Sequence, residues 1–260
     1  TQIFRFFTQA DVEVNNVYMK HYSQVFEPTE VQMMLAAFSN IETVHIAAYS
    51  HLLDTIGMPE VEYSAFLEYQ AMKDKWEHLQ DFNCKSKRDI ARTLAMFGAF
   101  TEGLALFASF AMLLNFPRHN KMKGMGQIVT WSARDETLHT HSVIRLFRTF
   151  IAENPDVWTD ELQKTIYKEC ETVITHEDAF IDLAFELGPV QGLTAEEVKQ
   201  YIRWIGDRRL LQLGLQLGDA LVLRVDERRE LVDGRLVLAE LSLRLELASQ
   251  IRLAPLLVGD

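Results

Sequence analysis

The sequence predicts an all-α protein, a bundle of long helices packed around a shared core. Long stretches of the first 215 residues carry apolar side chains at three- and four-residue steps, the spacing of one face of a helix. Short links, most of them containing Gly or Pro, separate these stretches, and the two-residue alternation typical of strands is essentially missing before residue 215. Seven long helices joined by short links can bury their apolar stripes by packing together, which predicts a helical bundle.

Composition limits the functions to consider. With 260 residues, 48% of them hydrophobic, the chain can bury one large core or two smaller ones. The net charge of −11 argues against nucleic acid as a partner, because phosphate binding needs a cationic surface. Two cysteines, Cys84 and Cys170, do not make a disulfide framework, and their scarcity favours a reducing compartment such as the cytoplasm. The first residues show no secretory leader pattern, so we expect no signal peptide.

The first two helices are predicted over residues 1–26 and 30–56. Apolar residues recur at mixed three- and four-residue steps in the first, with Asp11 placed among them. Thr29 is the expected N-terminal cap of the second helix, which ends at Gly57.

The third and fourth helices differ strongly in polarity. Residues 64–79 form an amphipathic helix, and residues 97–116 contain one charged residue, Glu102. The second of these stretches is long enough to span a membrane, but the carboxylate would then lie near mid-span at high cost. A core helix with a metal ion on Glu102 explains both features, so we predict no membrane association. The amphipathic helix is expected to direct four side chains inward: Phe66, Leu67, Met72 and Trp76.

Three more helices follow, over residues 122–150, 160–187 and from Thr194 to Leu213. The last begins with a Thr-x-x-Glu capping pattern. We predict that residues 1–215 form the bundle and that residues 216–260 do not belong to it. This final segment is dense in Leu and Arg and contains no lysine or aromatic residue. Its alternating stretch 241–247 fits a β-hairpin, and an amphipathic helix is equally open.

The chemistry of the chain is predicted by a repeated spacing. Glu42 and His45, three residues apart, project from one face of the second helix, and Tyr49 continues the same stripe. A chain of this composition contains about one Glu-x-x-His by chance, so a single copy means little. Glu136 and His139 repeat the spacing on another helix.

A single acid precedes each copy of this motif on an earlier helix. Asp11 precedes Glu42 by 31 residues, and Glu102 precedes Glu136 by 34. One acid from each of two helices and Glu-x-x-His from two others is the ligand set of a dinuclear carboxylate site in a four-helix bundle. Four carboxylates and two histidines suit iron or manganese better than zinc or copper. The alternative is that six polar residues occupy apolar helix faces by chance, but buried unpaired acids are rare.

The order D…E-T-V-H-x-x-x-Y…E…A-R-D-E-x-L-H resembles the small, radical-generating subunit of class I ribonucleotide reductase. The resemblance runs from residue 1 to about residue 215, and residues 201–210 are similar to that family's closing bundle helix. It implies a ferritin-like helical fold and two iron ions, with two manganese or a mixed manganese and iron pair as variants. It also implies oxygen activation, a tyrosyl radical, a homodimer, and a separate large subunit that reduces ribonucleotides to deoxyribonucleotides.

The resemblance also implies roles for individual residues. One metal would be bound by Asp11, Glu42 and His45 and the other by Glu102, Glu136 and His139, with carboxylates bridging. Tyr49 would be the radical tyrosine. The apolar pocket around it would include Leu106 and Phe110, with Ser132 nearby, and a purely structural core role is compatible with the same positions.

Asp135 would orient His45 through a ring nitrogen and belong to the radical transfer path, as the resemblance implies. The alternative is a surface ion pair with Arg134. The sequence departs from the family at both ends: a tryptophan-containing segment before Asp11 and a tyrosine-containing tail after residue 215 have no counterpart here. We expect the metal site to assemble without them, whereas radical delivery to the large subunit depends on them.

Two other functions are compatible with the same helices. One is a ferritin-like di-metal oxidase or oxygenase that does not export a radical, and the other is a non-catalytic scaffold. Asp11 and Tyr49 favour the reductase subunit, and the complete set of six ligands argues against a scaffold. No glycine-rich phosphate loop or nucleophile elbow is present to support phosphoryl or acyl transfer.

Overall fold

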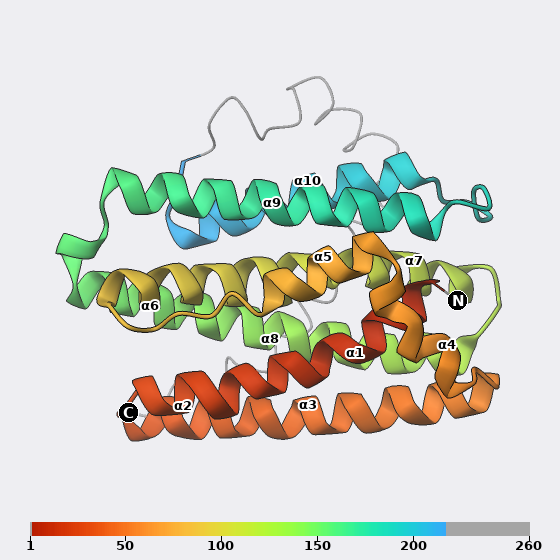
Figure 1. Cartoon of the computed structure of the whole chain (residues 1–260), viewed down its shortest axis with the longest axis horizontal. Helices are drawn as coiled ribbons and strands as arrows, with labels where there is room; N and C mark the ends of the chain where they lie inside the picture. Colours follow the sequence, from red (N-terminus) through yellow and green to blue (C-terminus); the bar gives the residue numbers. More distant parts are fainter. Residues whose placement is uncertain (1, 217–260) are drawn as a thin grey trace, which may run out of the picture.

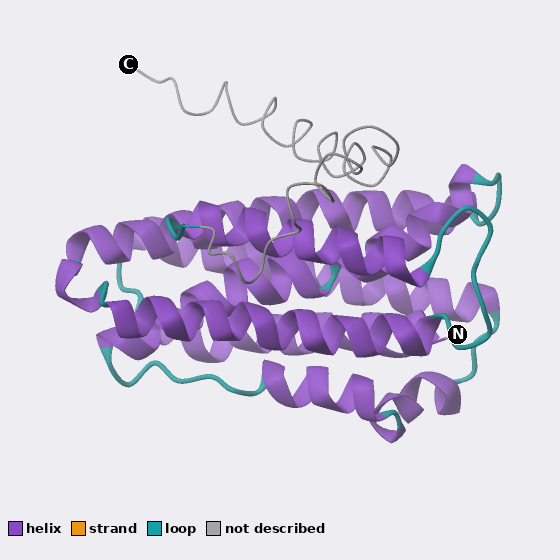
Figure 2. Ribbon diagram, turned by 90° about the horizontal axis from the view of Figure 1, so that it is seen from above, coloured by secondary structure: helices purple, strands orange, loops and turns teal. Residues whose placement is uncertain are grey.

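The structure, a computed structural model, describes residues 2–216. These residues form helices joined by loops, and no strand occurs among them beyond an isolated bridge between Val190 and Leu193 (Figure 2). This confirms the all-α prediction.

The helical elements follow one another closely along the chain. They are α1 (Gln2–Val17), a π-helical turn η1 (Tyr18–Tyr22), α2 (Ser23–Val25), α3 (Thr29–Ile56), α4 (Glu60–Ser64), a 3₁₀ turn η2 (Ala65–Glu68), α5 (Gln70–Leu79), α6 (Lys87–Leu94), a π-helical segment η3 (Ala95–Ala105), α7 (Phe107–Arg118), α8 (Lys123–Glu153), a 3₁₀ turn η4 (Pro155–Val157), α9 (Asp160–Ala184) and α10 (Ala195–Leu213).

The long helices run roughly parallel or antiparallel to one another in layers. Helices α1 and α3 pack together along one side of the molecule, and α9 and α10 pack together along the opposite side (Figure 1). Between them lie α8 and the run from α6 through η3 to α7. Because η3 packs against α8, α9 and α10, it occupies the middle of the bundle.

The apolar stretch predicted as a core helix is the central one. Residues Lys87–Arg118 are long and apolar enough to cross a membrane, but 94% of the most apolar window is buried inside the protein. The run begins with a capping box in which Ser86 and Asp89 exchange side-chain and backbone hydrogen bonds. A helix that is apolar all round is expected at the core of a large bundle.

Two predicted helix boundaries are confirmed, and one predicted N-terminal cap is wrong. Gly57, at φ 71°, ends α3 in the left-handed conformation, and Thr194 with Glu197 forms the predicted capping box of α10. Thr29 is not the cap of α3, since Pro28 takes that position and Thr29 is already helical.

The helix predicted over residues 64–79 is interrupted. A 3₁₀ turn ends at Glu68, and Tyr69 has extended backbone angles before α5 begins. Leu67 lies on this turn and is exposed, so the prediction that it points inward is wrong, whereas Met72 on α5 is fully buried. The predictions for the final segment fall on residues 217–260, outside the described residues.

Candidate metal centre

Acidic and imidazole side chains from four helical segments converge in the middle of the bundle. One carboxylate comes from α1 and one from η3, while α3 and α8 each contribute a Glu and a His three residues apart. The i, i+3 spacing directs both members of each pair to the same side of their helix. None of the six residues is more than 4% exposed: Asp11, Glu42, His45, Glu102, Glu136 and His139.

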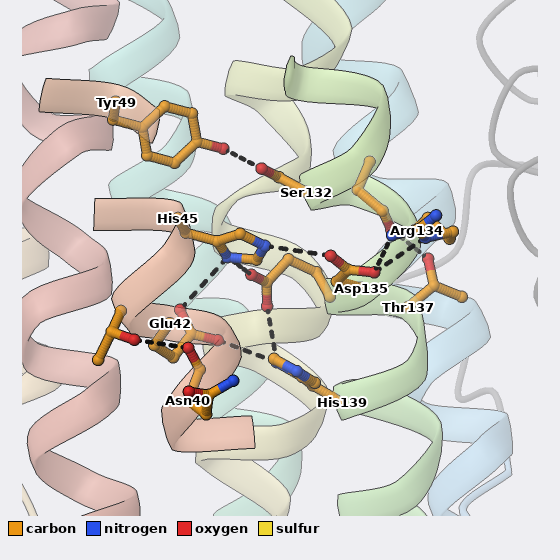
Figure 3. A network of polar contacts seen from close by, with 12 residues as sticks. Asn40, Glu42, His45, Tyr49, Ser132, Arg134, Asp135, Thr137 and His139 are labelled. Atoms are coloured by element: carbon orange, nitrogen blue, oxygen red, sulfur yellow. Dashed lines mark hydrogen bonds and ion pairs between the residues drawn. The ribbon is translucent and has the colours of Figure 1, made fainter. Parts of the chain in front are cut away.

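Two of the carboxylates lie between the two histidines. Glu42 Oε1 is 3.0 Å from His139 Nδ1, and Glu42 Oε2 is 3.5 Å from His45 Nδ1 (Figure 3). Glu136 Oε1 is 3.1 Å from His45 Nδ1, and its Oε2 is 3.5 Å from His139 Nδ1. Each carboxylate therefore offers one oxygen to each half of the cluster, the arrangement of a ligand that bridges two cations.

The remaining two carboxylates stand at the two ends. Ligand atoms of Asp11, Glu42 and His45 all lie within 4.8 Å of one another. The same limit holds for a second group, which contains Glu102. Its other members are Glu42, Glu136 and His139.

The charges of the cluster are badly balanced without a cation. Burial, and then the negative charge of the neighbouring carboxylates, raises the pKa of Asp11 well above its usual range. Burial likewise raises the pKa of Glu102 to about 7. Although burial alone would lower the pKa of His139, its contacts with three glutamates raise that pKa well above the usual value. The protein alone must take up protons to hold these groups together, and metal ions would remove that need.

The unsatisfied atoms of the cluster fit metal ions. Both imidazole Nδ1 atoms and several carboxylate oxygens are buried without a hydrogen-bond partner among the described residues. Unsatisfied buried polar atoms of this kind are rare unless an ion or water completes the site. The donors are mainly carboxylate oxygens, as hard cations such as iron and manganese prefer. The unsatisfied oxygens are Asp11 Oδ2, both of Glu42, Glu102 Oε2 and Glu136 Oε2.

Asp135 contacts both of its predicted partners. Its Oδ2 lies 3.4 Å from His45 Nε2, on the ring side away from the cluster, and Arg134 Nε donates to Oδ1 at 2.9 Å (Figure 3). Burial would raise the pKa of Asp135, but these two neighbours lower it. The two predicted readings are therefore compatible, since one carboxylate serves both contacts.

Tyr49 lies beside His45 in the same helix and is buried. The two ring centroids are 6.3 Å apart, and the Tyr49 hydroxyl donates to Ser132 Oγ on α8 at 2.5 Å (Figure 3). Burial, followed by the negative charge of Asp11, raises the pKa of Tyr49 well above its usual value. The phenol is thus held neutral, close to the cluster and away from bulk water.

Leu106 and Phe110 are both buried in the hydrophobic core at the start of α7. Leu106 separates η3 from α7 and lines a small cavity with Ala10 and Thr101, the neighbours of Asp11 and Glu102. Their burial is compatible with a pocket around the tyrosine, and that role stays a prediction.

One contact of the cluster was not foreseen. The Tyr18 hydroxyl donates to Glu102 Oε1 at 2.5 Å, and Tyr18 is fully buried. From the sequence this tyrosine counts only as an apolar position. A signal was available, because Tyr18 follows Asp11 by seven residues, or about two helical turns, on the same face of the first helix.

Comparisons with known proteins agree with this geometry. The chain matches the family described as ribonucleotide reductase, small chain, over residues 1–217. A probable ribonucleoside-diphosphate reductase small subunit of Invertebrate iridescent virus 3 is 45% identical over 231 residues, which cover 82% of this chain and 61% of the viral protein. The chain thus spans less than two thirds of the length of this relative.

Solved structures share the fold. A putative class I ribonucleotide reductase from Bacillus halodurans superimposes with a TM-score of 0.76 at 20% identity, covering 83% of this chain and 79% of that one. An R2-like ligand-binding oxidase with a manganese and iron cofactor gives a TM-score of 0.68 at 15% identity, with 82% and 78% covered. From the family match over all described residues and the 45% identity to the viral relative, the chain belongs to the ribonucleotide reductase small-chain family.

Proposed function

We propose that this chain is the small subunit of a ribonucleoside-diphosphate reductase. Its dinuclear centre, with iron in both positions, would oxidise Tyr49 to a radical that a separate large subunit uses to reduce ribonucleotides to deoxyribonucleotides. One observation carries the proposal: Glu42 and Glu136 each offer an oxygen to both histidines, and a buried tyrosine lies directly beside one of those histidines.

The proposed roles of the six ligands follow from their positions. Asp11 and His45 would hold one ion, Glu102 and His139 would hold the other, and two carboxylates would serve both. The bridging residues are Glu42 and Glu136. When bound, the metal pair supplies oxygen activation and a one-electron oxidant. The protein keeps the ligands converged and excludes water, because the whole cluster is buried.

Tyr49 and Asp135 have separate tasks in this proposal. Tyr49 would pass the hydrogen atom of its hydroxyl, proton and electron together, to the oxidant that the centre supplies, while Ser132 fixes the orientation of the hydroxyl. Asp135 holds the imidazole of His45 by the nitrogen facing away from the cluster, and it connects the centre to Arg134 at the partly exposed surface of α8. This is the direction in which the radical equivalent would leave. Leu106 and Phe110 keep the surroundings of the radical dry.

The partners and the metal belong to the same proposal. The acidic chain would form a homodimer, and this homodimer would work with the large catalytic subunit in the cytoplasm. It would not bind nucleic acid. Iron is proposed because the donors are mainly carboxylates; manganese alone or a mixed manganese and iron pair is distinguished by metal analysis of the isolated protein.

Reconstitution of the metal-free protein tests the proposal. Ferrous iron and oxygen are added, and optical and electron paramagnetic resonance spectra are recorded for the native protein and for Tyr49→Phe. We expect two iron ions per chain in both, and a stable tyrosyl signal in the native protein with a component that disappears in Tyr49→Phe. Metal oxidation without any stable radical in the native protein favours an oxidase that keeps its oxidising equivalent, and no metal uptake favours a non-catalytic scaffold.

A further inference from the structure

We propose that Tyr18 is a second oxidisable tyrosine of this centre, placed at the end opposite Tyr49 and equipped with its own proton acceptor. The inference rests on the proposed function, which supplies the oxidant. It adds a redox role for a residue on η1, outside the helix that carries Tyr49.

The two tyrosines are placed alike around the cluster. The Tyr49 ring centroid lies 6.3 Å from that of His45, and the Tyr18 ring centroid lies 6.1 Å from that of His139. Both phenols are almost completely buried. Each histidine of the centre thus has one enclosed tyrosine beside it, so an oxidant formed between the histidines has two candidate electron donors at similar range.

Tyr18 also has a group that can take its proton. A phenol oxidised by one electron becomes a strong acid, so a base that accepts the hydroxyl proton makes the oxidation easier. The Tyr18 hydroxyl already donates to Glu102 Oε1 at 2.5 Å. In the step we infer, the Tyr18 O–H bond breaks, the proton passes to Glu102 Oε1, and the electron passes to the one-electron oxidant supplied by the oxygen-activated metal pair. The product is a neutral phenoxyl radical on Tyr18.

The surroundings would protect that radical. Aromatic rings enclose Tyr18, with centroids 5.8 Å away for Phe38, 5.4 Å for Phe97 and 6.3 Å for Tyr22. All of these residues are buried, so water has little access to the ring. Dry, apolar walls slow the quenching of a one-electron oxidant.

Tyr22 is a natural control for this inference. It is as buried as Tyr18 and touches the same Phe97 ring, but its hydroxyl donates to the backbone carbonyl of Thr93 at 3.0 Å. An amide carbonyl is a much weaker base than the carboxylate that accepts from Tyr18. Oxidation is therefore expected to stop at Tyr18 and not to move on to Tyr22.

The test uses the Tyr49→Phe variant, in which the principal donor is absent. Metal-free protein is mixed with ferrous iron and oxygen and frozen rapidly, and its paramagnetic resonance spectrum and iron content are measured. We expect a tyrosyl signal in Tyr49→Phe, its loss in Tyr49→Phe/Tyr18→Phe, and its retention in Tyr49→Phe/Tyr22→Phe. Site-specific 3-fluorotyrosine at position 18 of Tyr49→Phe keeps the phenol, and a fluorine hyperfine splitting then places the radical on that residue even if the double variant loads iron poorly.

Other outcomes overturn the inference. If the native protein forms its radical but Tyr49→Phe, fully loaded with iron, forms none, Tyr18 only positions Glu102 and the proposed function survives. A signal that persists without Tyr18, or that lacks the fluorine splitting, places the electron donor elsewhere. A native protein that binds no iron removes both the inference and the proposed function.

Discussion

Individual buried charges constrain this protein more than any other kind of residue. Apart from the six clustered groups, few charged side chains are buried among the described residues: Lys75, Glu177, Asp207 and Arg209. His141 on α8 is only partly buried, and Gln212 Nε2 lies 3.3 Å from its Nε2. Burial, and then the positive charges of Arg209 and Arg208, lowers the pKa of His141 from 6.5 to about 4.

This shift predicts a pH effect on stability. Because the pKa of His141 is lower in the folded chain, the unfolded chain takes up a proton that the folded chain does not as the pH falls from about 6.5 to about 4. The free energy of unfolding should therefore fall across that window. In His141→Gln, which keeps a polar partner for Gln212, the fall should be smaller when urea unfolding of the metal-free protein is compared at pH 7 and pH 4.5. Equal falls in both proteins would contradict the assignment.

At the scale of elements, the π-helical segment η3 carries Glu102 into the cluster and depends on close packing. Gly98 on η3 faces Val143 on α8, and a Cβ atom at Gly98 would lie 2.4 Å from Val143 Cγ1. No ordinary contact is that short, so any side chain there must push the two elements apart.

Gly98→Ala is accordingly expected to destabilise the bundle by about 1–3 kcal/mol through overpacking. It should also weaken metal binding, because Gly98 lies about one turn before Glu102. Gly124→Ala is the matched control, since a Cβ at that helical position meets nothing within 4 Å. Thermal unfolding and iron binding of the two variants measure the difference; a Gly98→Ala protein as stable as Gly124→Ala would show that η3 and α8 can separate freely.

A buried ion pair fixes a second set of elements together. Lys75 on α5 contacts Glu177 on α9 and donates to the carbonyl of Ala105 at the end of η3. Its ammonium group lies over the rings of Phe6 and Phe180. Burial nevertheless raises the pKa of Glu177 to about 7. The pair is costly to desolvate, and its main effect is to hold the glutamate in place.

Removing the lysine should therefore be more harmful than removing both charges. Lys75→Met leaves a buried unpaired carboxylate, and we expect a loss of about 3–5 kcal/mol at pH 8. The loss should shrink at pH 6, because a folded carboxyl with a raised pKa binds its proton as the pH falls and no longer carries a buried charge. Lys75→Met/Glu177→Gln should recover most of the stability in urea unfolding. If the double variant is less stable than Lys75→Met, then Lys75 and Glu177 stabilise the fold through contacts other than the interaction between their charges.

For the whole molecule, all candidate ligands and the described core lie within residues 2–216. The family match ends at residue 217, and α10 ends at Leu213 with Gly214 at φ 91°. We predict that a chain truncated after Gln216 binds two metal ions per chain. Its unfolding temperature should stay within a few degrees of that of the full chain, the shift that a change in stability of about 1 kcal/mol would cause. Metal analysis and calorimetry of both chains test this. Loss of metal binding on truncation would extend the domain beyond the predicted boundary.

The sequence predicted the helical parts of this molecule well where a local rule applies. The spacing of Glu42 and His45, and of Glu136 and His139, fixes two side chains to one helix face whatever the surroundings. It could not predict the break at Tyr69, because an apolar pattern continues through it while the backbone turns. It also could not predict the π-helical geometry of η3, which no local propensity encodes.

By itself, the sequence determined the all-α class, the buried central helix and the family, because helical periodicity and motif spacing are local properties of the chain. The tertiary structure alone decided which carboxylate oxygens face both histidines, that Lys75 pairs with Glu177, and that Tyr18 donates to Glu102, 84 residues away. Contacts between distant segments depend on how the helices cross and rotate. Those choices are set by the packing of the whole core and not by any one stretch of residues.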